Sequence, residues 1–207
     1  MSLLRAGDRG WLVECGAHSP AAVAVAIRAQ PWAERLQDVV PAAATVLVVA
    51  SDAATMPQLA VALRELLARG TAAPTEAVER RTVVVPVRYD GPDLAEVAHR
   101  TGRSPAEIAE LHSTAEYTVD FFGFAPGYAY IGGVPEALRV PRMDSPRPRV
   151  AAGTLAIAGP YTVVYPGNTP GGWLQIGTAE LEIWNLAHDP PTMLSVGDRV
   201  VFEREAS

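Results

Sequence analysis

The second half of the sequence alternates short apolar runs with turns rich in glycine and proline, beginning near Tyr117. No part of this region shows the spacing of three to four residues that marks an amphipathic helix. The runs of strand length are YTVDFFGF, GTLAIAG, YTVVYPG, GWLQIG, LEIWNL and DRVVFE. Short apolar runs separated by frequent turns are typical of all-β barrels and tight sandwiches. The sequence therefore predicts a barrel or a sandwich in this region.

Strand and helix patterns alternate in the first half of the sequence. Strands are expected at residues 11–16, 39–50 and 81–89, helices at 20–36 (interrupted by Pro31) and 57–69, and a polar loop at 71–80. The stretch 39–50 has room for two strands, which gives the order strand, helix, strand, strand, helix, strand. That order favours a small α+β sandwich of ferredoxin-like type. We expect an α+β domain at residues 1–85 and the barrel domain at residues 86–207.

Two helices are expected to lead into the barrel. The first, at residues 93–102, ends at a glycine, which is a common helix stop. The second begins with Ser104 at the N-cap, Pro105 at the first helical position and Glu107 three residues after the cap. This pattern predicts a capping box.

Charge and composition narrow the classes of partner and chemistry. The formal net charge is −6, and the arginines are scattered apart from Arg139, Arg142, Arg147 and Arg149. We therefore expect no nucleic-acid partner, which would need a concentrated basic face. All 17 basic residues are arginine, which excludes a P-loop lysine and a Schiff-base lysine. The single cysteine, Cys15, excludes an internal disulfide and a cysteine-cluster metal site. We expect a cytoplasmic protein with no membrane partner, because no apolar run reaches the length of a membrane span or a signal peptide.

Three loops of unusual composition are candidates for a binding site. The first, FFGFAPGYAYIGGVP, carries Pro126, Gly127, Tyr128 and Tyr130. Glycine lets backbone N–H groups approach a ligand, and tyrosine adds a flat face with a polar tip. The alternative is architectural: glycine and proline form barrel turns, while the rings of Phe121, Phe122 and Phe124 fill the core.

The other two loops have a related composition. YPGNTPGGWLQIG contains Gly171, Gly172 and Trp173, and SPRPRVAAGT places Arg147 and Arg149 before Gly153 and Thr154. Arginine suits the recognition of a carboxylate because its guanidinium can donate two parallel hydrogen bonds. The three loops could converge at one barrel mouth. Spacing alone leaves a binding site and an architectural pattern equally open.

His112 is the candidate for proton transfer, and Glu116 follows it by four residues. An imidazole in a cleft can act as a general acid or base because its pKa lies near neutrality. The alternative is that His112 caps the C-terminus of its helix, where positive charge is favoured. The pair is not the zinc-binding HExxH motif, and no other histidine has ligand spacing, so no metal site is expected.

The motifs ELHSTAEYTVDFFGFAPGYAYIGG, PRPRVAAGTLAIAG and YPGNTPGGWLQIG, in this order, closely resemble a bacterial family. It is known as the B subunit of 5-oxoprolinase, allophanate hydrolase subunit 1 or the Kip-inhibitor family. The resemblance covers nearly the whole chain, including GDRGWLVECG and VPVRYDGPDLAEVAHRTG. It implies a small α+β domain followed by a cyclophilin-like β-barrel. This agrees with the fold expected from the residues.

The resemblance also implies an activity: ATP-dependent opening of 5-oxoproline to L-glutamate. Two partners would share it, the C subunit (of the allophanate hydrolase subunit 2 type) and the A subunit of 5-oxoprolinase. ATP, with magnesium, is expected to bind with or through those partners. The alternatives are a subunit of a urea- or allophanate-degrading enzyme and a non-catalytic module that inhibits a histidine kinase. Prolyl isomerisation rests on the barrel analogy alone.

Site residues follow from this resemblance as expectations. His112 and Glu116 are expected to be catalytic, Arg149 to hold the substrate carboxylate, and Gly127, Gly153 and Gly171 to supply backbone donors. The remaining residues expected to bind substrate are Pro126, Tyr128, Tyr130, Thr154, Gly172 and Trp173.

Overall fold

The computed structural model describes residues 1–70 and 81–205, so the loop predicted at residues 71–80 lies outside the described residues. The chain forms two compact units, Met1–Glu79 and Arg80–Ser207. Among the described residues, no helix combines the length and the apolar character needed to cross a lipid bilayer.

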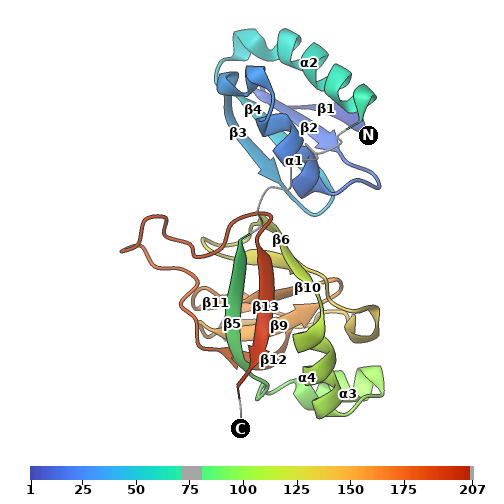
Figure 1. The fold of residues 1–207 in the computed structure, drawn as a ribbon, viewed down its shortest axis with the longest axis vertical. Helices are drawn as coiled ribbons and strands as arrows, with labels where there is room; N and C mark the ends of the chain where they lie inside the picture. Colours follow the sequence, from blue (N-terminus) through green and yellow to red (C-terminus); the bar gives the residue numbers. More distant parts are fainter. Residues whose placement is uncertain (71–80, 206–207) are drawn as a thin grey trace. The chain divides into compact units, whose positions relative to one another are not determined.

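The first unit is a four-stranded antiparallel sheet with two helices (Figure 1). Its elements are β1 (Ser2–Ala6), β2 (Gly10–Glu14), α1 (Pro20–Arg28), η1 (Pro31–Arg35), β3 (Leu36–Pro41), β4 (Thr45–Ala50), η2 (Ala53–Thr55) and α2 (Met56–Arg69). The strand order is β1-β2-β4-β3. Pro31 ends the first helical stretch as predicted, and the stretch 39–50 divides into two strands.

One hydrophobic core holds this unit together. Every second residue of β4 is buried, namely Val46, Val48 and Ala50, as expected for a strand with one covered face. Buried residues of both helices belong to the same core, including Ile27 of α1 and Leu63 of α2. Both helices therefore pack on one face of the sheet.

The second unit is a closed barrel with the strand order β10-β7-β6-β13-β5-β12-β9. Its elements are β5 (Thr82–Arg88), α3 (Leu94–Thr101), α4 (Pro105–Thr114), β6 (Tyr117–Phe122), β7 (Ala129–Gly132), η3 (Glu136–Leu138), β8 (Arg147–Val150), β9 (Thr154–Ala158), β10 (Tyr161–Val164), β11 (Thr169–Gly171), β12 (Leu174–Ala179) and β13 (Arg199–Arg204). The capping box of α4 is present as predicted. Strands β8 and β11 form a separate two-stranded ribbon.

The predicted fold class is confirmed: a small α+β unit precedes a β-barrel. Two strand assignments were wrong. Strand β5, assigned to the first domain, pairs in parallel with β13 and antiparallel with β12, so the predicted boundary after residue 85 falls inside a barrel strand. The N-terminal β1, which the sequence analysis did not predict, forms the edge of the first sheet beside β2. The run LEIWNL forms only an isolated bridge between Trp184 and Thr192.

Candidate functional site

Tyr165 joins the three loops that the sequence singled out. Its backbone N–H donates to the carbonyl of Thr154 and its carbonyl accepts from the N–H of Gly153, both at 2.9 Å. Its ring contacts Tyr128 of the first loop, with centroids 5.2 Å apart and planes at 87°. Its hydroxyl lies against the backbone of Gly171. The three loops, whose convergence the sequence left open, therefore meet at Tyr165.

The rings around Tyr165 form a cluster separate from the barrel interior. Tyr128 and Tyr165 are buried in it, while Tyr130 and Trp173 are partly exposed at its edge. The centroids of Tyr130 and Trp173 are 5.6 Å apart, with planes at 72°. We call these four residues the aromatic cluster. Edge-to-face contacts of this kind stabilise such a group. One face of Tyr130 is stacked on Phe121, with centroids 4.3 Å apart and planes at 15°.

Two glycines are required by the close packing beside this cluster. A Cβ at Gly171 would overlap the hydroxyl of Tyr165, and a Cβ at Gly127 would lie 2.7 Å from the Cβ of Trp184. Gly127 also has φ of 73°, in the left-handed region that favours glycine. These two positions therefore have a packing role, which the architectural interpretation predicted.

The hydroxyl groups of the cluster are protonated donors. Burial raises the pKa of Tyr128 and of Tyr165 above the ordinary tyrosine value. The Tyr165 hydroxyl is buried, and no described residue gives it a hydrogen bond of good geometry, although the Tyr128 hydroxyl and the Trp173 N–H lie close.

Arg142 is a residue of this site that our expectations missed. Burial raises the pKa of Tyr128 and Tyr130, and the neighbouring Arg142 guanidinium acts in the opposite direction. Its side chain is exposed, so a positive charge lies at the open edge of the cluster. The run of arginines between residues 139 and 149 was a sequence signal for this charge. We chose Arg147 and Arg149 as candidates because they precede the turn at Gly153 and Thr154.

Arg147 and Arg149 have surroundings that differ from those of Arg142. Arg147 donates two hydrogen bonds to the buried carboxylate of Asp93, at 2.7 and 2.9 Å, which ties the ribbon to the barrel. Arg149 is exposed and follows Arg147 by two residues in β8, so it shares a strand face with Arg147. Val150, on the opposite face, packs in the aromatic cluster. This geometry argues against Arg149 as the residue that holds a ligand at the cluster.

His112 lies in the barrel interior, away from solvent. Its Nδ1 is 2.9 Å from the hydroxyl of Tyr89 and its Nε2 is 3.1 Å from the hydroxyl of Thr162. Because Thr162 donates to the carbonyl of Ala156, it accepts from Nε2–H, and Nδ1 accepts from Tyr89. The ring also packs on Phe202, with centroids 4.8 Å apart.

Burial lowers the pKa of His112 to about 3. The imidazole is therefore neutral near pH 7, fully buried, and hydrogen-bonded at both nitrogens. These features argue against the general acid–base role expected for it, and also against a charged helix cap. Sequence periodicity could not separate these cases, since His112 lies in the last turn of α4 in each of them.

The remaining expected residues are spread around the barrel. Glu116 is highly exposed, with a long ion pair of 3.7 Å to Arg199. Pro126 is exposed in the first loop, and Gly172 is buried. The N–H of Gly153 already donates to Tyr165, so it is not free for a substrate. Thr154 is partly buried at the start of β9.

Phe124, which the architectural alternative placed in the core, is instead 65% exposed. Its φ of 70° lies in the left-handed region, which is unfavourable for a residue with a bulky side chain. It lines an apolar groove together with Pro126 and Trp184, the latter from the segment that contains the isolated bridge. Leu186, in the same segment, is 81% exposed. An exposed apolar surface of this kind is typical of a contact site for another protein.

The described residues also contain no group of three or more His, Cys, Asp or Glu side chains arranged to hold a metal ion.

Solved structures with the same fold include two at more than 30% identity. TTHA0988 superposes with a TM-score of 0.78 at 35% identity, over 96% of this chain and 40% of TTHA0988. PH0987 from Pyrococcus horikoshii, a conserved uncharacterized protein, gives a TM-score of 0.59 at 33% identity, over 99% of this chain and 97% of PH0987. The Kluyveromyces lactis urea amidolyase shares the fold at 16% identity, with a TM-score of 0.69 over 99% of this chain and 15% of the amidolyase.

Curated relatives carry the name that the motifs suggested. The B subunit of 5-oxoprolinase from Bacillus subtilis (strain 168) is 46% identical over 130 residues, which are 61% of this chain and 54% of the relative. The protein of the same name from Escherichia coli O157:H7 is 48% identical over 127 residues, 60% of this chain and 58% of the relative. The match thus spans little more than half the length of these relatives, and the resemblance drawn from the motifs is confirmed.

The profile of the carboxyltransferase domain, subdomain C and D, matches residues 1–194. Because that match includes both units of the fold, the chain belongs to the carboxyltransferase domain family, subdomains C and D.

Proposed function

We propose that this chain is one subunit of an ATP-dependent enzyme that opens 5-oxoproline to L-glutamate together with partner subunits. The observation that carries the proposal is the identity of 46% and 48% to two proteins named as the B subunit of 5-oxoprolinase. The meeting of the three loops at Tyr165 supports it, because these loops carry the motifs of the resemblance. Both relatives are named as one subunit of an enzyme, so we assign the complete activity to an assembly.

The aromatic cluster is the surface that we assign to the substrate. 5-Oxoproline presents a carboxylate, a lactam carbonyl and a small apolar ring. Arg142 would attract the carboxylate, while the partly exposed rings of Tyr130 and Trp173 would pack on the lactam. The protonated hydroxyl of Tyr165, which lacks a hydrogen-bond partner among the described residues, would donate to a substrate oxygen. Polarising a lactam carbonyl in this way favours attack at its carbon.

We assign ATP and its magnesium ion to the partner subunits, because the sequence has no lysine and therefore no P-loop. ATP supplies the chemical activation of an otherwise stable amide. The residues of this chain would hold and orient the lactam, and the buried His112 would support the barrel rather than transfer a proton.

The groove beside Phe124 is the surface that we assign to the C subunit. Its lining is predominantly apolar, with Phe122, Phe124 and Trp184 contributing rings, and the exposed Leu186 lies in the segment that follows Trp184. Aromatic anchors at the centre of an apolar patch commonly provide most of the binding energy in protein interfaces. The A subunit would join the assembly, which we place in the cytoplasm.

The test is glutamate formation from 5-oxoproline in a mixture of this chain with its cognate C and A subunits. We expect product only when all three polypeptides, ATP and magnesium are present. Urea and allophanate serve as competing substrates, and turnover of these instead of 5-oxoproline would overturn the proposal. Inhibition of a histidine kinase by this chain, with no turnover in a verified assembly, would favour the regulatory alternative.

A further inference from the structure

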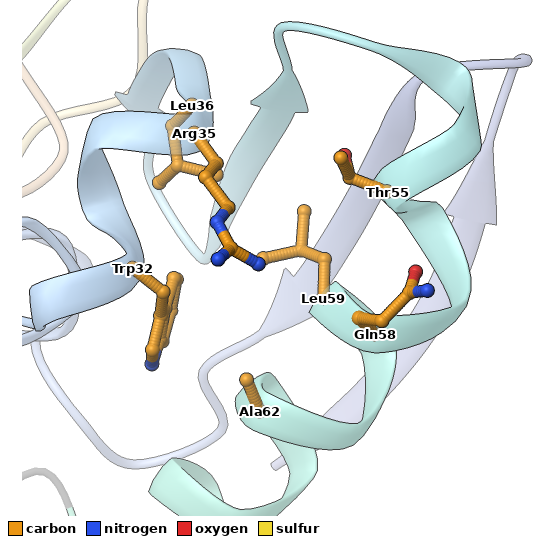
Figure 2. A pocket seen from close by; sticks show the side chains of 7 residues that line it. All are labelled: Trp32, Arg35, Leu36, Thr55, Gln58, Leu59 and Ala62. Carbon is orange, nitrogen blue, oxygen red and sulfur yellow. The ribbon is translucent and has the colours of Figure 1, made fainter.

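The first unit contains a pocket that is independent of the barrel site. It lies between η1 and α2, and has a volume of about 220 Å³. Its lining residues are Trp32, Arg35, Leu36, Thr55, Gln58, Leu59 and Ala62. Figure 2 shows the guanidinium of Arg35 extending across the space between Trp32 and α2.

The walls of this pocket are mainly apolar. Leu59 is buried, and Trp32 and Leu36 pack partly against the core of the unit. Ala62, one turn further along α2, presents only a methyl group and leaves the space open. Such walls favour an apolar ligand body, because binding removes water from the apolar surfaces of both the pocket and the ligand.

The pocket also contains a single charge, that of Arg35. Among the described residues, seven other arginines lie within 4.0 Å of a carboxylate oxygen, whereas Arg35 has no ion pair there. Its backbone is fixed, since its carbonyl accepts from Ser51 N–H at 3.0 Å.

We propose that this pocket binds a small monocarboxylate with an apolar body, whose carboxylate pairs with Arg35 and whose body contacts Trp32 and Leu59. At roughly 30 Å³ for a water-sized group, the volume suits about seven non-hydrogen atoms. The proposal concerns the first unit alone and does not depend on the function proposed for the barrel.

Hexanoate, hexanol and hexyltrimethylammonium are suitable probes, because they share an apolar body and differ in charge. Each is titrated into the full chain while the indole N–H resonance of Trp32 is followed by NMR, assigned with Trp32→Phe. We expect saturable shifts with hexanoate, binding at least about fivefold weaker with hexanol, and none with the cation. Equal binding of hexanol and hexanoate, or no shift of Trp32 with hexanoate, would overturn the proposal.

Variants locate the charge and the cavity. Arg35→Gln should weaken hexanoate binding about fivefold and leave hexanol unchanged, and Ala62→Phe should block both. Arg64→Gln is the matched control, since Arg64 is an exposed arginine of α2, the helix that carries Ala62, and does not line the pocket. Arg35 is exposed, so its substitution should leave folding intact even if Ala62→Phe does not fold. An Arg35→Gln protein that binds hexanoate as tightly as Arg64→Gln would contradict the assignment.

Discussion

The hydroxyl of Tyr165 lies against the backbone of Gly171, in the space that a side chain at residue 171 would need. Tyr165 ends one barrel hairpin and Gly171 belongs to the ribbon strand β11, so this contact fixes how the ribbon lies on the barrel. The aromatic cluster depends on that arrangement, because Tyr128 and Trp173 pack around the same ring and its neighbours.

Gly171→Ala should therefore destabilise the fold by about 1–3 kcal/mol, the usual cost of overpacking a buried site. Gly172→Ala is the matched control, because the nearest heavy atoms to a Cβ at residue 172 are 3.5 Å away. Urea unfolding of the two variants makes the comparison. Equal changes in the free energy of unfolding would show that the Tyr165 contact is not tight.

Tyr165→Phe should separate binding from stability. The ring stays, and the buried hydroxyl that is lost has no partner among the described residues, so the free energy of unfolding should not fall. In the assembled enzyme the KM for 5-oxoproline should rise about tenfold, as expected when a hydrogen bond to substrate is lost. Tyr117→Phe is the control, since its buried hydroxyl also lacks a partner among those residues but belongs to the barrel interior. Similar KM values for the two variants would refute the role of Tyr165.

His112 should make the stability of the protein depend on pH. Its pKa is lowered from 6.5 to about 3, so below pH 6.5 the unfolded chain takes up a proton that the folded chain does not. The stabilisation is complete above pH 6.5 and is lost as the pH falls toward 3, by about 1.4 kcal/mol per pH unit.

Urea unfolding between pH 7.5 and 4.5 measures this effect. The variant His112→Gln should be less stable than the wild type at pH 7.5, with a smaller loss of stability on acidification. Other groups that titrate in this range affect both proteins, so the difference in slope isolates His112. Parallel slopes would mean that the pKa of His112 is not lowered in the folded state.

Phe124→Ser should weaken the association with the C subunit by about tenfold or more, the effect of removing an aromatic anchor from an interface. Folding should be unaffected, because the side chain is 65% exposed. Val84→Ser is the control, as Val84 is also apolar and 47% exposed but does not line the groove. Sedimentation analysis of mixtures gives the two dissociation constants. If both variants bind this partner as the wild type does, the groove is not the interface.

Local patterns in the sequence predicted the elements well, and their partners less well. The capping box of α4 and the strand character of β5 depend on neighbouring residues, so they could be read directly. The pairing of β5 with β13 joins residues more than a hundred positions apart, and no local pattern reports it. The N-terminal β1 was missed because it is short and half-exposed.

For the candidate site, too, local sequence features could be predicted and tertiary contacts could not. Unusual composition marked the loops that meet at Tyr165, but it could not show which side of β8 faces the cluster, so Arg149 was preferred to Arg142. It also could not show that His112 enters the barrel or that Phe124 remains outside it, since burial of a single ring depends on tertiary packing.

Phosphate release from ATP tests the central claim most directly, measured with and without 5-oxoproline on this chain alone, on the C and A subunits together, and on all three. We predict release that is stimulated by 5-oxoproline only in the complete mixture, as expected of a site shared between polypeptides. Equal stimulation of the two partners without this chain, or none in a verified assembly of all three, would contradict the account.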